Sequence, residues 1–263
     1  MIITMRTVAS SDRTPIAFDE LGAGPPLIMV VGAFNTRSTT APLAAALQDQ
    51  FTILNYDRRG RGDSGDTQPY SVEREIEDLG ALIAEAGGSS AVFGYSSGAN
   101  LALKAAAHGL QISKLALYDA PFVVDDSYPP LPPDLAEQLA KLIAAGRRGD
   151  AVELYQAKAV GMPEDVVAQL RRAPFRPALE AIAHTLVYDA TIIGDLTLPT
   201  ELVASVTVPT LVIDGEKSPP IMHSAARVLA ETLPNGRRQT LAGEGHDISP
   251  DATASVLQDF LSS

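Results

Sequence analysis

The sequence predicts an α/β protein built on a mostly parallel sheet. Short apolar or β-branched runs alternate with helical patterns along much of the 263 residues. From the third run onward most are continuous rather than alternating, which is typical of strands covered on both faces. Strand–helix alternation favours parallel pairing with right-handed crossovers. We therefore expect an eight-stranded, mostly parallel sheet flanked by helices, with strands at 2–8, 15–19, 27–31, 52–56, 91–93, 114–118, 210–213 and 238–241.

The clearest helical pattern is SVEREIEDLGALIAEAGG, residues 71–88. Ser71 is a suitable capping residue, and Val72, Ile76, Leu79 and Ile83 fall on one face. The glycine pair at 87–88 is a helix stop signal. The segment therefore predicts an amphipathic helix packed on the sheet.

Residues 121–205 break the alternation. They contain no convincing strand, and prolines and glycines divide them into four helical patterns: PPLPPDLAEQLAKLIAAG, DAVELYQAKAV, EDVVAQLRR and ALEAIAHTLVYDA. We interpret 121–205 as a helical cap inserted after the sixth strand, with 1–120 and 206–263 forming the core.

Composition excludes several functions. A formal charge of -12, with no run of Lys or Arg longer than two, disfavours nucleic acid and anionic membranes as partners. There is no cysteine, and the four histidines lack the paired spacing of metal ligands, so we expect no metal and no cofactor. No signal peptide or 18-residue apolar run is evident, which predicts a cytoplasmic protein.

The stretch AVFGYSSGANLAL points to chemistry. An apolar strand runs into Gly94-Tyr95-Ser96-Ser97-Gly98 and a small-residue helix follows. A G-x-S-x-G pattern in this setting is typical of a nucleophile elbow, in which a strained turn exposes the central serine above the sheet. Ser96 is the predicted nucleophile.

A serine hydroxyl needs a base, and position favours one of the four histidines. His108 lies twelve residues along the same helix, roughly 18 Å from Ser96 at 1.5 Å per residue, which is too far. His184 falls in the predicted cap, and His223 near the start of a helix. His246 follows the last strand in a glycine-bounded loop, at the sheet edge where α/β proteins build their sites, so His246 is the predicted base.

The elbow GYSSG, the segment YDRRGRGDSG, the strand exit VVGAF and the terminal GEGHD together resemble the α/β-hydrolase superfamily over essentially the whole chain. The resemblance implies a serine hydrolase and a scaffold role for Arg59 and Asp63. It also implies that the backbone N–H groups of Ser97 and Ala33 form the oxyanion hole. The histidine common before the loop glycine is replaced here by Val31.

Serine hydrolases of that superfamily use a third residue, a carboxylic acid that holds the histidine. The position of this acid in the sequence departs here from the usual pattern. In most members it follows the seventh strand, three residues after a glycine, where this chain has Ser218. Some members, including lactonases, take it from the exit of the sixth strand. We therefore expect Asp119 to be the acid, with Asp214 and Glu216 as the alternatives.

The residues around the predicted site are mostly apolar. Phe34, Tyr95, Phe122 and the Val123-Val124 pair flank it, and His184 and Tyr188 share one helix face that could point toward Ser96. An apolar carboxylic ester or lactone is the expected substrate.

Two other functions use the same residues. Perhydrolysis, halide oxidation or acyl transfer follows if peroxide or an alcohol replaces water. From a different class, a non-catalytic small-molecule receptor is compatible with the absence of an acid at position 218.

Overall fold

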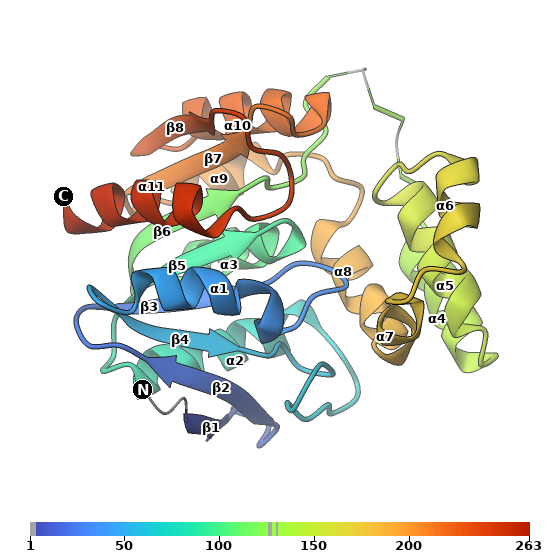
Figure 1. Ribbon diagram of the computed structural model, residues 1–263, viewed down its shortest axis with the longest axis horizontal. Helices are drawn as coiled ribbons and strands as arrows, with labels where there is room; N and C mark the ends of the chain where they lie inside the picture. The colour runs from blue at the N-terminus through green and yellow to red at the C-terminus, as the bar shows by residue number, and fades with distance from the viewer. Residues whose placement is uncertain (1–3, 126–127, 130) are drawn as a thin grey trace.

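The computed structural model describes residues 4–125, 128–129 and 131–263 and contains one eight-stranded sheet of order β1-β2-β4-β3-β5-β6-β7-β8. The first three strands in this order pair antiparallel, and all the others pair parallel. Helices cover both faces (Figure 1). The predicted mostly parallel sheet is confirmed, and its strands are β1 (Thr4–Ala9), β2 (Pro15–Leu21), β3 (Pro26–Val30), β4 (Thr52–Tyr56), β5 (Ser90–Tyr95), β6 (Ile112–Tyr118), β7 (Thr210–Gly215) and β8 (Gly236–Leu241).

The central strands are apolar on both sides because both faces are covered. Every residue of β5 and of β7 is buried, as the continuous apolar runs predict. The edge strand β8 is exposed over most of its length and carries Arg237 and Arg238. Charged side chains on an edge strand discourage pairing with another chain.

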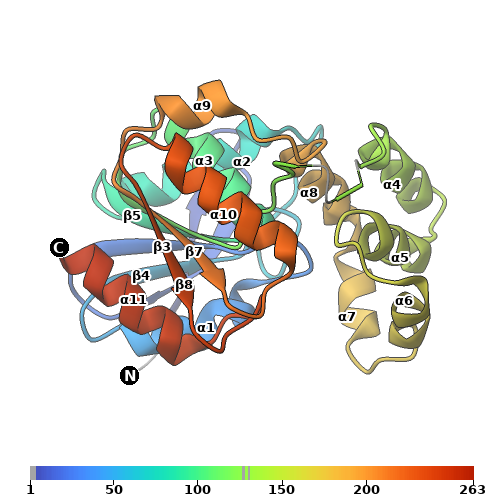
Figure 2. The same cartoon turned by 90° about the horizontal axis from the view of Figure 1, so that it is seen from above.

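The two faces of the sheet bury separate apolar clusters. Helices α2, α3, α9 and α10 cover one face, and α1 and α11 cover the other (Figures 1 and 2). In α2 the predicted apolar positions Ile76, Leu79 and Ile83 are buried, as is Leu82. The bounds of these helices are α1 (Arg37–Leu47), α2 (Val72–Glu85), α3 (Ser97–Ala107), α9 (Thr200–Ser205), α10 (Pro220–Thr232) and α11 (Pro250–Ser262).

Most of the helices between β6 and β7 lie beyond the carboxyl ends of the strands, where they bury a third apolar cluster (Figure 1). Seen from above, α4, α5 and α6 stand furthest from the sheet, with α7 and α8 beside them (Figure 2). The fourth predicted helical pattern is divided into α7, a 3₁₀ turn and α8. The elements are α4 (Leu135–Ala144), α5 (Arg148–Lys158), α6 (Glu164–Leu170), α7 (Arg176–Ala181), the turn (Ala183–Thr185) and α8 (Leu186–Ile193).

The end of this helical region differs from the expected boundary at residue 205. Helix α9 packs on α3 and α10, and its Val203 belongs to the apolar cluster of the sheet. Leu198 belongs to the same cluster. By packing, Leu198 and α9 are therefore part of the core, whereas α4 to α7 form the separate layer and α8 contacts both.

The turn between β5 and α3 brings helix and strands unusually close. A Cβ on Gly98 would lie 2.6 Å from the carbonyl oxygen of Val31, and one on Gly94 would lie 2.6 Å from the Cα of Ala99. Only glycine allows this approach. Ser96, between them, has φ 55° and ψ -129°, in the region that side chains rarely occupy.

Replacing Gly98 with Ala should therefore destabilise the protein. The added methyl group meets backbone atoms of β3 that cannot move independently, and overpacking of this kind costs about 1–3 kcal/mol. The free energy of unfolding, measured in urea, tests this. Gly80→Ala is the matched control, because Gly80 lies in α2 with its would-be Cβ 3.5 Å from the nearest atom, Cδ2 of Leu110. The free energy of unfolding of Gly80→Ala should rise by roughly 0.5–1 kcal/mol. An equal change in the free energy of unfolding at both positions would show that close packing at Gly98 is not the cause.

Candidate active site

The strained turn places Ser96 at the carboxyl edge of the sheet. Its N–H donates to the carbonyl of Tyr118 at 2.9 Å, which ties the turn to the end of β6. The loop after β3 covers it closely: a Cβ on Gly32 would lie 2.8 Å from the Cβ and 3.3 Å from the Oγ of Ser96. Ser96 itself remains partly exposed. The hydroxyl is thus held at a fixed point beside a loop whose backbone approaches it.

Asp119 and His246 are hydrogen-bonded at the same edge. Asp119 directly follows β6, with φ 46°, and is 1% exposed. Nδ1 of His246 lies 2.9 Å from Asp119 Oδ2, and His246 comes from the loop after β8. Because the carboxylate engages Nδ1, Nε2 is the nitrogen free to accept a proton.

Ser96 and Asp119 follow paired positions of adjacent strands, since Tyr95 is the register partner of Tyr118. Within the described part of the chain, Ser96 Oγ makes no hydrogen bond to His246. Such bonds are often long in free enzymes and tighten when substrate binds. The backbone geometry thus places the predicted nucleophile beside the predicted acid, and the hydrogen bond places the predicted base on that acid.

The loop that carries His246 is fastened to the strands beneath it. The hydroxyl of Tyr118 donates to the carbonyl of Gly245 at 2.6 Å, and the N–H of Lys217 donates to the carbonyl of Glu244 at 2.7 Å. The ring of Tyr95 lies 5.2 Å from the imidazole of His246, centroid to centroid. Tyr95, predicted to contact substrate, is thus 5% exposed and packs against the imidazole.

Ser218 occupies the position where most members of the superfamily carry the acid, and it contacts Asp119. Its hydroxyl donates to Asp119 Oδ2 at 2.6 Å. The Asp119 carboxylate therefore receives two hydrogen bonds on one oxygen, from Ser218 and from His246. Position 218 therefore supplies a hydrogen-bond donor to the Asp119 carboxylate.

The two alternative acids are engaged elsewhere. Asp214 receives two hydrogen bonds from Arg238, at 2.9 and 2.8 Å, one from Thr240, and lies 2.6 Å from Nδ1 of His223. Burial by itself would raise the pKa of Asp214, but the hydrogen bonds from Arg238 and His223 outweigh it and lower the pKa. Glu216 accepts the N–H of Gly243 at 2.6 Å.

The two predicted oxyanion donors, the N–H groups of Ser97 and Ala33, come from segments in contact, but the N–H of Ala33 is already hydrogen-bonded. Ser97 is the first residue of α3, so its N–H is among those that a helix start leaves without an intrahelical partner. The N–H of Ala33 donates to the side-chain oxygen of Ser97 at 2.9 Å. That oxygen in turn donates to Asp189 at 2.8 Å, a contact with α8 that the sequence did not suggest.

The predicted substrate contacts divide into two groups. Phe34, with φ 64°, borders the cluster of the α4–α8 helices, and its ring lies edge-on to Tyr155 at 5.4 Å. Phe122 is 4% exposed and packs in the core cluster of the sheet instead. Phe34 therefore packs against the α4–α8 helices and stays a predicted substrate contact, whereas Phe122 packs in the core.

His184 and Tyr188 contact the loop after β4 rather than Ser96. Tyr188 stacks on Tyr70 with ring centroids 3.8 Å apart, and its hydroxyl donates to Asp66 at 2.8 Å. His184 packs edge-on to Tyr188, with Nε2 3.7 Å from Asp66. Burial lowers the pKa of His184. These contacts favour a role in fastening α8 to the core over the predicted role in binding substrate.

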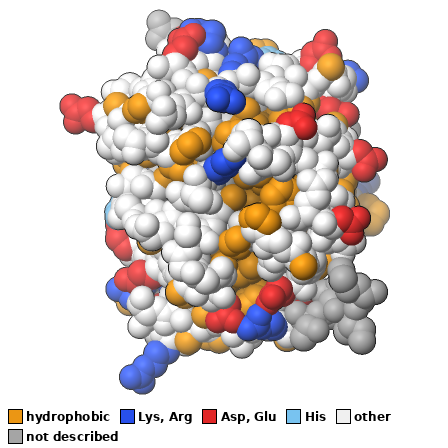
Figure 3. All heavy atoms as spheres, turned by 90° about the vertical axis from the view of Figure 1, so that its left-hand side faces the viewer, with side chains coloured by type: hydrophobic (Ala, Val, Ile, Leu, Met, Phe, Trp, Pro, Cys, Tyr) orange, Lys and Arg blue, Asp and Glu red, His pale blue; other side chains and the backbone are white. Residues whose placement is uncertain are grey.

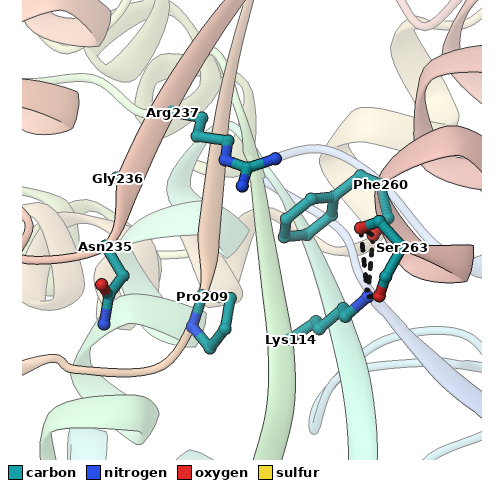
Figure 4. Close-up of a pocket in the computed structure, with 7 residues that line it drawn as sticks. All are labelled: Lys114, Pro209, Asn235, Gly236, Arg237, Phe260 and Ser263. Carbon is teal, nitrogen blue, oxygen red and sulfur yellow. Dashed lines mark hydrogen bonds between the residues drawn. The ribbon is translucent and has the colours of Figure 1, made fainter.

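A hollow of 370 Å³ lies at the opposite edge of the sheet, where Lys114, Pro209 and Gly236 mark the starts of the last three strands. Figure 3 shows the face of the molecule turned away from the α4–α7 helices, with a band of apolar side chains along its middle. In the close-up of the hollow, the amine of Lys114 points to the end of the chain, where it donates to the carbonyls of Phe260 and Ser263, each at 2.9 Å (Figure 4). Lys114 thus stabilises the end of α11, far from Ser96.

The fold is that of an α/β hydrolase. A family model described as "Alpha/beta hydrolase family" matches residues 27–256, so the chain belongs to that family. Within the described residues, no group of three or more His, Cys, Asp or Glu side chains could hold a metal ion, and none of the described helices has the length and hydrophobicity to cross a bilayer.

The chain is similar to several solved structures. An alpha/beta hydrolase from Sphaerobacter thermophilus is 55% identical with a TM-score of 0.92, over 97% of this chain and all of that one. An esterase from Rhodococcus is 20% identical, with a TM-score of 0.70 over 99% of each chain. An enol-lactonase from Burkholderia xenovorans is 21% identical, with a TM-score of 0.72 over 98% of this chain and all of that one. The last two show likeness of fold alone.

Asp214→Asn should destabilise the protein in a pH-dependent way. The folded-state pKa of Asp214 is lowered, so its ionised form contributes stability that is present above the ordinary pKa of about 4. This contribution is lost as the pH falls through the lower folded-state value. At pH 7 the variant should lose about 1–3 kcal/mol, since charged hydrogen bonds are worth roughly this much.

Urea unfolding at pH 7 and at pH 3 measures this difference. The gap between Asp214→Asn and the unsubstituted protein should narrow at the lower pH. A gap that is constant or widens toward acid would show that the Asp214 charge does not stabilise the fold.

Proposed function

We propose that the protein is a serine hydrolase that cleaves a carboxylic ester or lactone of an apolar small molecule. The observation that carries the proposal is the Asp119–His246 hydrogen bond of 2.9 Å, formed at the sheet edge where Ser96 has a positive φ. A strained serine after β5, a carboxylate after β6 and an imidazole after β8, all at one sheet edge, are the parts that acyl transfer needs.

In the proposed reaction the oxygen of Ser96 attacks the carbonyl carbon, and its proton passes to Nε2 of His246. Asp119 holds the imidazole through Nδ1 and stabilises the positive charge that it gains. The negative charge on the former carbonyl oxygen is stabilised by the N–H of Ser97 and by that of Ala33, which exchanges its hydrogen bond to the Ser97 side chain for one to the oxyanion. His246 then protonates the departing alcohol oxygen, which leaves an acyl group on Ser96.

Water completes the cycle. His246 takes a proton from a water molecule, whose oxygen attacks the acyl carbon, and the second tetrahedral intermediate collapses with return of the proton to Ser96. In a lactone the departing oxygen stays tethered to the acyl group, and the product is a hydroxy acid. No step needs a cofactor.

The surroundings of Ser96 support an apolar substrate. The cluster of the α4–α8 helices extends to Ala33, Phe34 and Val123, which come from the core side of the site. The nearby arginines Arg58 and Arg61 are buried and paired, so they offer no charge to an anionic substrate. Esterase and enol-lactonase activities among structures of this fold agree with the proposed reaction class.

Ser96→Ala should abolish the hydrolysis of p-nitrophenyl esters while leaving the fold intact. Loss of the nucleophile removes the acyl-enzyme, and losses of about 10⁶-fold accompany such changes in serine hydrolases. Initial rates with short-chain, long-chain and lactone substrates measure the effect. A fluorophosphonate should label the unsubstituted protein once per chain and leave the variant unlabelled.

Several outcomes would redirect the assignment. Retained turnover in Ser96→Ala would refute the nucleophile. Peroxide-dependent bromination without ester cleavage would move the reaction to halide oxidation, and acyl transfer to an added alcohol would make the protein a transferase. Failure of the fluorophosphonate to react would favour a receptor.

Asp119→Asn should lower kcat by several orders of magnitude, because the amide cannot stabilise the protonated imidazole; the same change in a serine protease costs about 10⁴-fold. Asp214→Asn is the matched control, being a buried aspartate at the end of the neighbouring strand, and should leave kcat nearly unchanged. Steady-state kinetics on both variants measure the ranking. The reverse ranking would assign the acid to Asp214.

A further inference from the structure

A buried ion network joins helix α8 to the residues around Ser96. Asp189 of α8 is fully buried, and its Oδ1 accepts hydrogen bonds from Arg58 and from the Ser97 hydroxyl, both at 2.8 Å. Its Oδ2 accepts one from Arg61 at 2.6 Å. Glu75 makes two hydrogen bonds of 2.7 Å to Arg58. Two carboxylates therefore balance two guanidinium groups, as buried charges require.

The two arginines hold the carbonyl groups of the loop that covers Ser96. Arg58 donates to the carbonyl of Val31 at 3.2 Å. Arg61 donates to the carbonyls of Gly32 at 2.5 Å and Asn35 at 3.2 Å. Both arginines are themselves held by Asp189, so the positions of these three carbonyl groups are set from α8.

Ser97 holds the N–H of Ala33 in the same loop. Its hydroxyl has one proton, which it donates to Asp189, and so its lone pairs are left to accept the N–H of Ala33. The peptide between Gly32 and Ala33 is thereby held at both ends, its oxygen by Arg61 and its N–H by Ser97. The Gly32 end of this peptide lies close to the Ser96 side chain, since a Cβ on Gly32 would be 2.8 Å from the Cβ of Ser96.

We propose that Asp189 is a positioning residue for the reaction at Ser96: acting through Ser97 and Arg61, it fixes the orientation of the Gly32–Ala33 peptide beside the nucleophile. The inference rests on the proposed function, since it concerns the rate of attack by Ser96. A peptide fixed beside the nucleophile limits the reorganisation that the Ala33 N–H needs in moving from Ser97 Oγ to the oxyanion, and donors that reorganise least stabilise an oxyanion best.

The charge on Asp189 is part of this arrangement. Burial alone would raise the pKa of Asp189, but the charges of Arg61 and Arg58 outweigh it and lower the pKa. The carboxylate therefore remains ionised at neutral pH and accepts all three hydrogen bonds. Because Asp189 belongs to α8, the packing of this helix on the core and the conformation of the 31–35 loop depend on each other.

Ser97→Ala is the decisive variant, because it removes the hydroxyl and keeps both the backbone N–H of residue 97 and every ion pair. We expect kcat to fall roughly 10- to 100-fold, somewhat less than the loss of a complete oxyanion donor, with KM nearly unchanged. Affinity for an alkyl boronic acid, which forms a tetrahedral adduct with a reactive serine, should fall by a similar factor to kcat/KM. A merely structural role would not weaken the adduct selectively.

Ser90→Ala is the matched control. Ser90 is a buried serine at the other end of β5, and its hydroxyl donates to the carbonyl of Ala91. This variant should keep the kcat and the boronic acid affinity of the unsubstituted protein. A comparable loss in Ser90→Ala would show that any buried hydroxyl of this region affects the rate through stability.

Asp189→Asn, checked for folding by circular dichroism, supplies the second arm. A double variant combines Ser97→Ala with Asp189→Asn. If Asp189 acts through Ser97, the kcat of the double variant should be no lower than that of Asp189→Asn alone. Fully additive losses would separate Asp189 from Ser97 and overturn the proposal. Ser97→Ala tests it independently if Asp189→Asn does not fold.

The results separate this inference from the proposed function. An inactive unsubstituted protein, or an active Ser96→Ala, would overturn the function itself. With the function established, an unchanged kcat in Ser97→Ala would overturn the positioning role. A raised kcat would do so as well, by showing that the hydroxyl withholds the Ala33 N–H from the oxyanion.

Discussion

The close approach of helix α3 to strands β3 and β5 is the constraint on which the site depends. Gly94 and Gly98 lie where a side chain would meet backbone atoms, and Gly32 lies where one would meet Ser96. With the helix this near, the chain reverses within the turn, and Ser96 takes a positive φ that costs about 1–3 kcal/mol. The hydrogen bond from its N–H to Tyr118 and the packing of α3 hold it there. The position of the partly exposed Ser96 is thus a consequence of how closely α3 packs on the strands.

Sequence alone predicted the parts of the structure that local patterns determine. Continuous apolar runs locate the strands because a strand covered on both faces has no polar side. The turn at Ser96 was recognisable because glycines at 94 and 98 have few other reasons to flank a serine between a strand and a helix. The division of the last helical pattern into α7, a turn and α8, and the packing of α9 on the core, were not predictable. They depend on contacts between segments distant in sequence.

The buried charges could not be found from local pattern either. Glu75 and Asp78 look like part of the polar face of α2, yet each is 1% exposed, because Arg58 and Arg59 pair with them. Asp189 lies 131 residues from Arg58. A buried ion pair contributes little net stability compared with apolar packing, but removing one partner is costly. Such a network therefore contributes more to holding one conformation, here that of the loop over Ser96, than to the overall stability of the fold.

The choice of carboxylate at the sheet edge follows from hydrogen-bonding capacity. Asp119 and Asp214 both lie at the carboxyl ends of neighbouring strands near the loop of His246. The oxygens of Asp214 already receive hydrogen bonds from Arg238 and Thr240 and contact His223. A further imidazolium would therefore add little stabilisation to the charge of Asp214. Asp119 Oδ1 is buried without a partner among the described residues, and its Oδ2 receives only Ser218 and His246. Its charge is therefore compensated by few donors, and an imidazole that gains a proton is the group best placed to compensate it. Serine at position 218 fits this arrangement because it donates to the carboxylate, whereas a second carboxylate there would repel it.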